Sequence, residues 1–186
     1  MKKVGFFGGS FDPIHFGHIN LALELLEKGH LDEVLFCPAF CSPFKTGHPP
    51  VASKRDRLEM LKLALKAVPH TRITTLELDR EGPSYTVDTI RELQKQEKGA
   101  FRLLLSEEAA QEIDKWKEAK ELIRLAPPLI GVRASFSEGP FERVRTRVLE
   151  VSSTEIRERL QKKLYCGHLI PPIALDYILQ NGLYSR

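Results

Sequence analysis

The sequence Lys3-Val-Gly-Phe-Phe-Gly-Gly-Ser-Phe-Asp-Pro-Ile-His-Phe-Gly-His18 decides the fold class of this chain. Residues 3–7 form a short apolar run that ends at two glycines, which predicts a buried strand followed by a tight loop. From Phe16 to Lys28 the apolar residues recur at helical spacing, and Gly29 ends the pattern. The first unit is therefore predicted to be a strand, a glycine loop and a helix, an arrangement that suits phosphate binding.

The same alternation of strand and helix patterns continues to the end of the chain. Strands are predicted at 33–37, 72–76, 101–105, 129–133 and 147–151, and helices at 53–68, 85–97, 107–125, 153–163 and 173–180. This rhythm predicts an α/β fold of the Rossmann-like, doubly wound kind, with a mostly parallel sheet and helices on both faces. We expect a single domain over 1–186 with a C-terminal helical portion at about 152–186.

The composition is typical of a globular protein, with 42% hydrophobic and 28% charged residues in 186. The net charge of +3 is spread along the chain, which argues against a nucleic-acid partner. Cys37, Cys41 and Cys166 form no Cys-x-x-Cys pair, so we expect reduced thiols, a cytoplasmic location and no zinc site. No apolar run approaches membrane-spanning length, and no membrane partner is expected. The oligomeric state is left open.

His15 and His18 begin the predicted helix directly after the glycine loop. Imidazoles three residues apart lie on one face of a helix, and the helix start adds free N–H groups and a positive dipole end. Gly17 between them leaves room for a ligand to approach the backbone. A lone histidine is more often a core or capping residue, and zinc ligation would need a third ligand that the spacing does not supply. The combination favours an anion site.

A second helix start carries the hydroxyl residues Ser153 and Thr154, with Arg157 one turn later. Such hydroxyls can cap the backbone or bind phosphate oxygens, and the planar guanidinium can bind the same anion. In isolation an ordinary N-cap is the simpler interpretation. Because parallel strands bring their carboxyl ends to one edge of the sheet, we expect this helix start to meet the first one and to clamp the phosphates of a nucleotide.

The segment Gly8–His18 resembles the signature of the HxGH nucleotidyltransferases, and especially of bacterial nicotinate-nucleotide adenylyltransferases. Residues 151–157 resemble the family's Ile-Ser-Ser-Thr-x-Ile-Arg motif, and Pro43-Phe44-Lys45 resembles its Pro-His-Lys loop, with Phe44 in place of the usual histidine. A solvent-exposed lysine is the alternative interpretation of Lys45. The resemblance implies catalytic roles for His15, His18, Lys45 and Arg157. It implies ATP binding by Gly8, Gly9, Ser10, Phe11, His15, His18, Lys45, Ser153, Thr154 and Arg157.

The narrower resemblance rests on Gly82–Thr89, which is similar to the Gly-x-Ser-Tyr-Thr-x-Asp-Thr stretch of nicotinate-nucleotide adenylyltransferases. It implies that Ser84, Tyr85 and Thr86 help to hold the pyridine nucleotide. Trp116 falls where the family stacks an aromatic ring on the nicotinate, although a single tryptophan is more often a core residue. After the strand at 101–105 the family has Gly-Ala-Asp, whereas this chain has Ser106-Glu107-Glu108, and Glu108 is expected to replace the aspartate.

The resemblance implies a reaction of NAD biosynthesis, the transfer of AMP from ATP to nicotinate mononucleotide with release of pyrophosphate. ATP and nicotinate mononucleotide are then the partners. Mg²⁺ is the expected cofactor, held mainly by phosphate oxygens and water rather than by a protein metal site. Two alternatives stay open: another phosphate acceptor, such as nicotinamide mononucleotide or phosphopantetheine, and a nucleotide-binding protein that has lost its chemistry.

Overall fold

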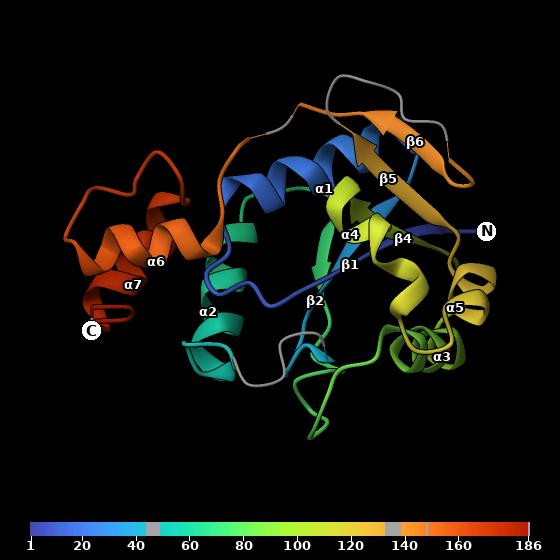
Figure 1. Cartoon of the computed structure of the whole chain (residues 1–186), viewed down its shortest axis with the longest axis horizontal. Helices are drawn as coiled ribbons and strands as arrows, with labels where there is room; N and C mark the ends of the chain where they lie inside the picture. The colour runs from blue at the N-terminus through green and yellow to red at the C-terminus, as the bar shows by residue number, and fades with distance from the viewer. Residues whose placement is uncertain (44–48, 133–138, 148, 186) are drawn as a thin grey trace.

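Strand β1 (Lys3–Gly9) lies in the interior of the sheet in the computed structural model of the chain (Figure 1). The structure describes residues 1–43, 49–132, 139–147 and 149–185. The strand order is β3-β2-β1-β4-β5-β6, and every neighbouring pair is parallel. The direction in which strands are added reverses between β1 and β4 (Ala100–Ser106), and ligands bind at such reversal points in doubly wound sheets.

The predicted α/β class is confirmed, and most predicted elements are present with ends shifted by one to three residues. The remaining strands are β2 (Glu33–Pro38), β3 (Thr71–Ile73), β5 (Pro128–Val132) and β6 (Glu142–Arg145). The helices are α1 (Phe16–Lys28), α2 (Lys54–Leu65), α3 (Thr86–Gln96), α4 (Glu107–Gln111), α5 (Ala119–Leu125), α6 (Ser153–Gln161), α7 (Pro172–Gln180) and the 3-10 helix η2 (Ile113–Lys115).

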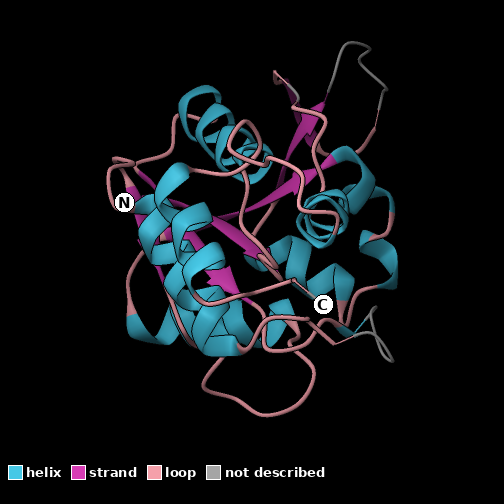
Figure 2. Ribbon diagram, turned by 90° about the vertical axis from the view of Figure 1, so that its left-hand side faces the viewer, coloured by secondary structure: helices cyan, strands magenta, loops and turns pink. Residues whose placement is uncertain are grey.

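Helices cover both faces of the sheet (Figure 2). Successive side chains of a strand point to opposite faces, so Phe6 and Phe7 of β1 enter different cores. Phe7 packs in the core that includes residues of α1, α2, α6 and α7, and Phe6 packs in the core that includes residues of α3 and α5. The parallel strands contribute buried apolar side chains to both cores, as expected for strands covered on both faces.

The C-terminal helices α6 and α7 lie beside α2, at the left of Figure 1. The Tyr177 hydroxyl of α7 donates a hydrogen bond of 2.9 Å to Oδ1 of Asp56 in α2. Ser53 caps α2, because its hydroxyl accepts from the backbone N–H of Asp56. Within the described ranges, no helix combines the length and the apolar character needed to cross a lipid bilayer.

The prediction of one helix over 107–125 is wrong. The segment forms α4, η2 and α5, because Trp116 adopts an extended conformation and Glu118 has a φ of 50° in the left-handed region. Both conformations interrupt the hydrogen-bond ladder of a helix. The break turns this segment across the end of the sheet, where Trp116 lines a cavity described below.

The prediction of a strand over 147–151 is also wrong. The strand that pairs with β5 is β6, at Glu142–Arg145, with Leu129 opposite Glu142. Val151 has another role, because it packs against the glycine at position 17, where an added Cβ would lie 2.8 Å from Cγ1 of Val151.

Candidate active site

Two adjoining cavities open at the carboxyl ends of β1 and β4. The larger has a volume of about 920 Å³ and the smaller about 380 Å³. The larger cavity contains the starts of both α1 and α6 in its wall, and the smaller contains the start of α3 together with Trp116. The residues that line both cavities are Ser10, His18, Leu21, Ser42 and Ser106.

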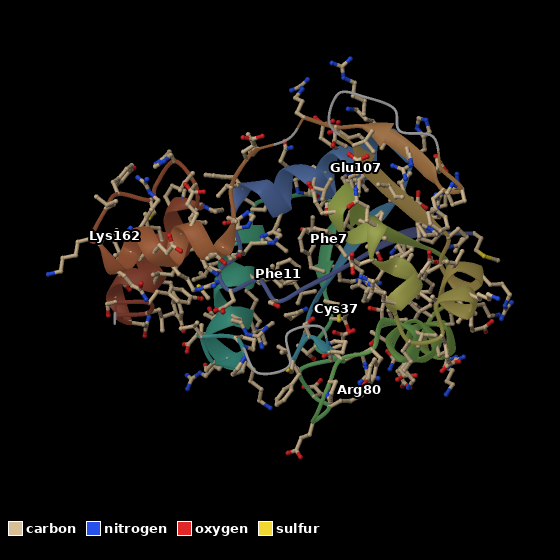
Figure 3. The ribbon with its side chains drawn as sticks, in the orientation of Figure 1. Phe7, Phe11, Cys37, Arg80, Glu107 and Lys162 are labelled. Atoms are coloured by element: carbon tan, nitrogen blue, oxygen red, sulfur yellow. The ribbon has the colours of Figure 1, made fainter. Side chains whose placement is uncertain are left out.

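The glycine loop after β1 is shaped by Phe11. This residue has a φ of 46°, in the left-handed region, and its side chain is 1% exposed. Its ring packs against Phe7 and Phe36, with centroids 5.9 and 5.8 Å away, at the centre of the molecule (Figure 3). Phe11 lines neither cavity, so its expected contact with ATP has no support from its position, because the ring serves the core. A Cβ at Gly9 would lie 3.0 Å from that ring, which explains the glycine there.

His15 and His18 are stacked at the start of α1. Their ring centroids are 3.6 Å apart with an interplanar angle of 22°. His15 is the N-cap of the helix, since its Nδ1 accepts a hydrogen bond of 3.3 Å from the backbone N–H of His18. Burial lowers the pKa of His15 from 6.5 to about 4, so its imidazole is neutral at neutral pH. His15 lines the larger cavity, whereas His18 stands in the wall between the two.

Asp12 is a buried residue of the glycine loop to which the sequence assigned no role. Its carboxylate, in a residue that is 5% exposed, accepts hydrogen bonds from the backbone N–H groups of Val51 and Ala52 at 2.7 and 3.0 Å. It also accepts a hydrogen bond of 2.7 Å from the Tyr184 hydroxyl. A buried carboxylate needs such donors, because burial without them is costly. Asp12 therefore joins the glycine loop to the segment before α2 and to the C-terminus.

The start of α6 contacts the same loop. Ser152 caps the helix by accepting from the backbone N–H of Glu155. The Ser153 hydroxyl donates to the backbone oxygen of Pro13 at 2.9 Å, and Nη1 of Arg157 donates to the backbone oxygen of Asp12 at 2.7 Å. Nη2 of Arg157 donates to the hydroxyl of the exposed Thr154. Ser153, Thr154 and Arg157 all line the larger cavity, as the two-helix clamp requires.

Arg57 is a buried residue that supports the site, and the sequence analysis assigned it no role. It is 1% exposed and lies on the apolar face of α2. Its Nη1 donates at 2.7 Å to the backbone oxygens of both Ser10 and Ala39, and its Nη2 donates to that of Phe40 at 3.3 Å. It thereby holds the loops after β1 and β2 together. The sequence did hold one signal for this residue, because Arg57 lies three residues before Met60 and so interrupts an otherwise apolar helix face with a charged side chain.

The smaller cavity brings together four residues that were predicted to hold the pyridine nucleotide. They are Ser84, Tyr85, Thr86 and Trp116. The Ser84 hydroxyl accepts a hydrogen bond of 2.9 Å from the backbone N–H of Phe40, which fixes the segment before α3 against the loop after β2. Nζ of Lys117 lies 4.8 Å from the centroid of the Tyr85 ring. The mixture of aromatic surface and hydroxyl groups suits a flat heteroaromatic ligand.

A buried polar cluster supports the floor of the smaller cavity. Glu77 is 4% exposed and lines this cavity, and its carboxylate accepts a hydrogen bond of 2.7 Å from the Thr89 hydroxyl. Burial raises the pKa of Glu77, an effect that the hydrogen bond from Thr89 opposes. Arg80 donates to the same Thr89 hydroxyl. The cluster anchors α3, whose first turn carries Thr86 at the cavity wall.

The unusual segment Ser106-Glu107-Glu108 forms the first residues of α4 and its cap. The Ser106 hydroxyl accepts from the backbone N–H of Ala109, and Oε1 of Glu107 accepts from Nη1 of Arg143 at 3.3 Å. Glu107 is labelled beside β6 in Figure 3. Glu108 lines the larger cavity and is absent from the wall of the smaller one.

Lys45 and Phe44 lie outside the described residues, so the structure does not place the predicted contact of Lys45. The neighbouring Pro49 and Pro50 line the larger cavity. Among the described residues, no group of three His, Cys, Asp or Glu side chains is arranged to hold a metal ion.

Comparisons with known proteins agree with this geometry. Residues 6–159 match the model of the cytidylyltransferase-like family. The chain is 40% identical over 190 residues to the nicotinate-nucleotide adenylyltransferase of Bacillus subtilis (strain 168), covering 100% of both chains. It is 37% identical over 188 residues to a probable nicotinate-nucleotide adenylyltransferase of Hydrogenobaculum sp. (strain Y04AAS1), covering 98% of both.

The solved structures that resemble this fold include the Plasmodium falciparum nicotinic acid mononucleotide adenylyltransferase complexed with NaAD. The TM-score is 0.80 with 20% sequence identity, over 100% of this chain and 98% of that one. At this identity the likeness concerns the fold. The sequence relatives decide the family: the chain belongs to the cytidylyltransferase-like family and, within it, to the nicotinate-nucleotide adenylyltransferases.

Proposed function

We propose that this chain transfers AMP from ATP to nicotinate mononucleotide, producing nicotinate adenine dinucleotide and pyrophosphate in NAD biosynthesis. The observation that carries the proposal is the shared wall of the two cavities, in which Ser10 and His18 face both. A transfer between two nucleotides needs two sites that meet where the phosphates react. The family membership supports the same reaction.

In this proposal ATP occupies the larger cavity. Its phosphates lie against the start of α1, where His15 and His18 and the helix dipole favour an anion. Of the predicted glycine-loop residues, Ser10 lines this cavity, whereas Gly8 and Gly9 line only the smaller one. The start of α6 closes the other side with Thr154 and Arg157. We propose a further phosphate contact for Lys45 on the basis of the sequence motif.

Nicotinate mononucleotide occupies the smaller cavity in this proposal. Its ring stacks on Trp116, and the backbone and hydroxyl groups of Ser84, Tyr85 and Thr86 hold the nucleotide. Its 5′-phosphate then points to the shared wall at Ser10 and His18. Ser106 caps α4 at this wall and takes the place of the glycine that relatives are expected to have.

The chemistry follows from this arrangement. An oxygen of the acceptor's 5′-phosphate forms a bond to the α-phosphorus of ATP, and the bond from that phosphorus to the oxygen bridging to the β-phosphate breaks. Pyrophosphate leaves with the bonding electrons. Because the attacking oxygen is already anionic, no general base is required. Alignment of the two phosphates supplies most of the rate, with about 7–11 kcal/mol attainable from positioning in favourable cases.

His15 acts in this scheme as a neutral donor. Its Nδ1 accepts from the backbone N–H of His18, so the proton of the neutral ring resides on Nε2. A neutral N–H can stabilise charge that develops on the phosphates without binding the product pyrophosphate as tightly as a fixed cation would. The positive charge comes from Arg157 and, in this proposal, from Lys45.

Mg²⁺ accompanies ATP in the proposed reaction. The described residues offer no carboxylate cage for it, so phosphate oxygens and water hold the ion. When bound, it neutralises charge on the leaving pyrophosphate. A cytoplasmic location and a single catalytic domain over the whole chain complete the proposal.

The test is an acceptor panel. Pyrophosphate release is measured with ATP, Mg²⁺ and one acceptor at a time: nicotinate mononucleotide, nicotinamide mononucleotide or phosphopantetheine. We expect the highest kcat/KM with nicotinate mononucleotide. A higher value with another acceptor contradicts the choice of acceptor, and ATP binding without release from any acceptor indicates a nucleotide-binding protein that has lost its chemistry.

A further inference from the structure

The last residues of the chain turn back into the molecule. Gly182 and Tyr184 have φ values of 59° and 62°, both in the left-handed region. For glycine this conformation is ordinary, but for a tyrosine it is disfavoured and persists only where the surroundings impose it. The two turns bury the Tyr184 side chain, which is 5% exposed although it lies two residues from the end of the sequence.

The Tyr184 hydroxyl is tied to the glycine loop. It donates a hydrogen bond of 2.7 Å to Oδ1 of Asp12, across 172 positions of sequence. Burial and the neighbouring Asp12 carboxylate raise the pKa of Tyr184, so the phenol keeps its proton and stays a donor. Oδ1 of Asp12 also accepts from Ala52, and Oδ2 accepts from Val51. Loss of the tyrosine hydroxyl removes one of these three donors from a buried carboxylate, and a carboxylate left short of donors shifts to find water or another partner.

A shift of the Asp12 carboxylate would change the wall of the cavity in which we place ATP. It lines the larger cavity, between Ser10 and His15 in the sequence. Its backbone oxygen accepts from Arg157, and Nη1 of Arg157 lies 3.9 Å from Oδ2 of Asp12. The Tyr184 hydroxyl, the Asp12 carboxylate and the Arg157 guanidinium thus form one connected group behind the phosphate-binding surface.

We propose that Tyr184 is a positioning residue for the adenylyl transfer: through Asp12, the C-terminus of the chain sets the shape of the glycine loop that receives ATP. The inference rests on the proposed function. Tyr184 lines neither cavity and touches no substrate in this scheme. Asp12, through which Tyr184 acts, lines the larger cavity and not the smaller one, so we expect the effect to fall on the ATP side of the reaction.

The chain offers a matched control for this proposal. Tyr177 is also a tyrosine of the C-terminal segment, and its hydroxyl also donates to an aspartate, Oδ1 of Asp56, at 2.9 Å. Asp56 belongs to α2 and lines neither cavity. The variants Tyr184→Phe and Tyr177→Phe each remove one hydroxyl and keep the ring that fills the space, so each is expected to fold, which circular dichroism verifies.

Steady-state kinetics of pyrophosphate release are measured for both variants and the unmodified chain, at a temperature where all three are fully folded. For Tyr184→Phe we expect the KM for ATP to rise about five- to tenfold, which corresponds to roughly 1.0–1.4 kcal/mol, with the KM for nicotinate mononucleotide within twofold. For Tyr177→Phe we expect all constants within twofold of the unmodified chain.

Three results would overturn the proposal. The first is a Tyr184→Phe variant whose constants all stay within twofold of the unmodified chain. The second is an equal loss in Tyr177→Phe, which would make the hydroxyl contact a general feature of the C-terminal helices. The third is a fall in kcat without a change in the KM for ATP, which would mean that the hydroxyl does not act through the binding of ATP. An inactive unmodified chain would instead contradict the proposed function.

Discussion

The starts of α1 and α6 both line the larger cavity, yet they are built differently. Helix α1 is capped by an imidazole, that of His15, and α6 is capped by a hydroxyl, that of Ser152. At α1, the rings of His15 and His18 stack on each other beside the cavity. At α6, the Ser153 hydroxyl and the Arg157 guanidinium donate to backbone oxygens of the glycine loop.

The two helix starts therefore have different roles, although their sequence motifs predict the same one. Both motifs predict phosphate binding, because each combines a helix start with side-chain donors. In the structure, the donors of α6 hold the loop that leads to α1, so α6 supports the surface that α1 presents. We infer that side chains of α1 act mainly on the rate, whereas those of α6 act on stability and rate together.

The largest effect is expected at α1, from His18→Ala. His18 lines both cavities, and loss of one donor at a transferring group typically lowers kcat by about 10²–10³-fold. We expect that loss in pyrophosphate release, with the thermal unfolding midpoint close to that of the unmodified chain. The control is His168→Ala, which removes an exposed imidazole stacked on Tyr165 outside both cavities. Near-normal turnover in His18→Ala would remove His18 from the mechanism.

Much of the fold was predictable because it depends on local patterns. The apolar run before Gly8 became β1, and the periodicity that ends at Gly29 became α1 with the predicted bounds, because burial and helix capping are encoded within a few residues. The break near Trp116 was not predictable in this way. Residues 107–125 have acceptable helix propensity, and the extended conformation of Trp116 follows from its place in a cavity wall, which is a tertiary property.

The site was predictable only in part, for a similar reason. His15, His18 and Arg157 were found because their motifs are contiguous in sequence. Arg57 was missed because its partners are backbone oxygens, which carry no sequence signal. Phe11 was assigned to the ligand because it stands inside the motif, and only the structure shows that its ring is buried against Phe7 and Phe36.

The second prediction concerns α6. Arg157→Lys keeps a positive charge but cannot reproduce the fork that contacts Asp12 and Thr154. We expect the free energy of unfolding to fall by about 1.5–3 kcal/mol, as for a hydrogen bond to a charged group. The kcat/KM for ATP falls with it, by about tenfold. Urea unfolding and steady-state kinetics measure the two quantities.

The control for this prediction is Arg159→Lys, on the same helix, whose guanidinium donates to the backbone oxygen of Tyr165. It is expected to change stability alone. If Arg157→Lys lowers activity at unchanged stability, Arg157 acts on the nucleotide alone and does not support the glycine loop, and the distinction between α1 and α6 fails.

The third prediction concerns the pH dependence of stability. Of the two N-caps, the His15 imidazole of α1 can gain a proton as the pH falls, whereas the Ser152 hydroxyl of α6 cannot. His15 has a pKa of about 4 in the folded chain and 6.5 as its ordinary value. Between these values the unfolded chain binds more protons, so stability falls as the pH is lowered from 7. At pH 5 the loss from this group is about 2 kcal/mol. Urea unfolding at pH 7, 6 and 5 measures the total change.

The matched variant is His15→Asn, which keeps a capping acceptor at the start of α1 but does not titrate in this range. We expect the pH dependence of the unfolding free energy to be flatter in His15→Asn by about 2 kcal/mol over this interval. Equal pH dependence in both proteins would mean that His15 is protonated as easily in the folded chain as in the unfolded one. Its proposed role as a neutral donor would then be lost.

The smallest effect is expected for Ser153→Ala, and it is the most direct test of what α6 does. The Ser153 hydroxyl has one proton, and it is donated to the backbone oxygen of Pro13 at 2.9 Å. A phosphate oxygen can only accept, so a bond to ATP would require the hydroxyl to leave Pro13. If it stays, the variant loses about 1 kcal/mol of stability and its KM for ATP changes less than twofold. Ser152→Ala, which removes the cap of the same helix, should cost a similar amount. A KM for ATP raised tenfold in Ser153→Ala alone would show that the hydroxyl changes partner on binding, and that Ser153 contacts the nucleotide.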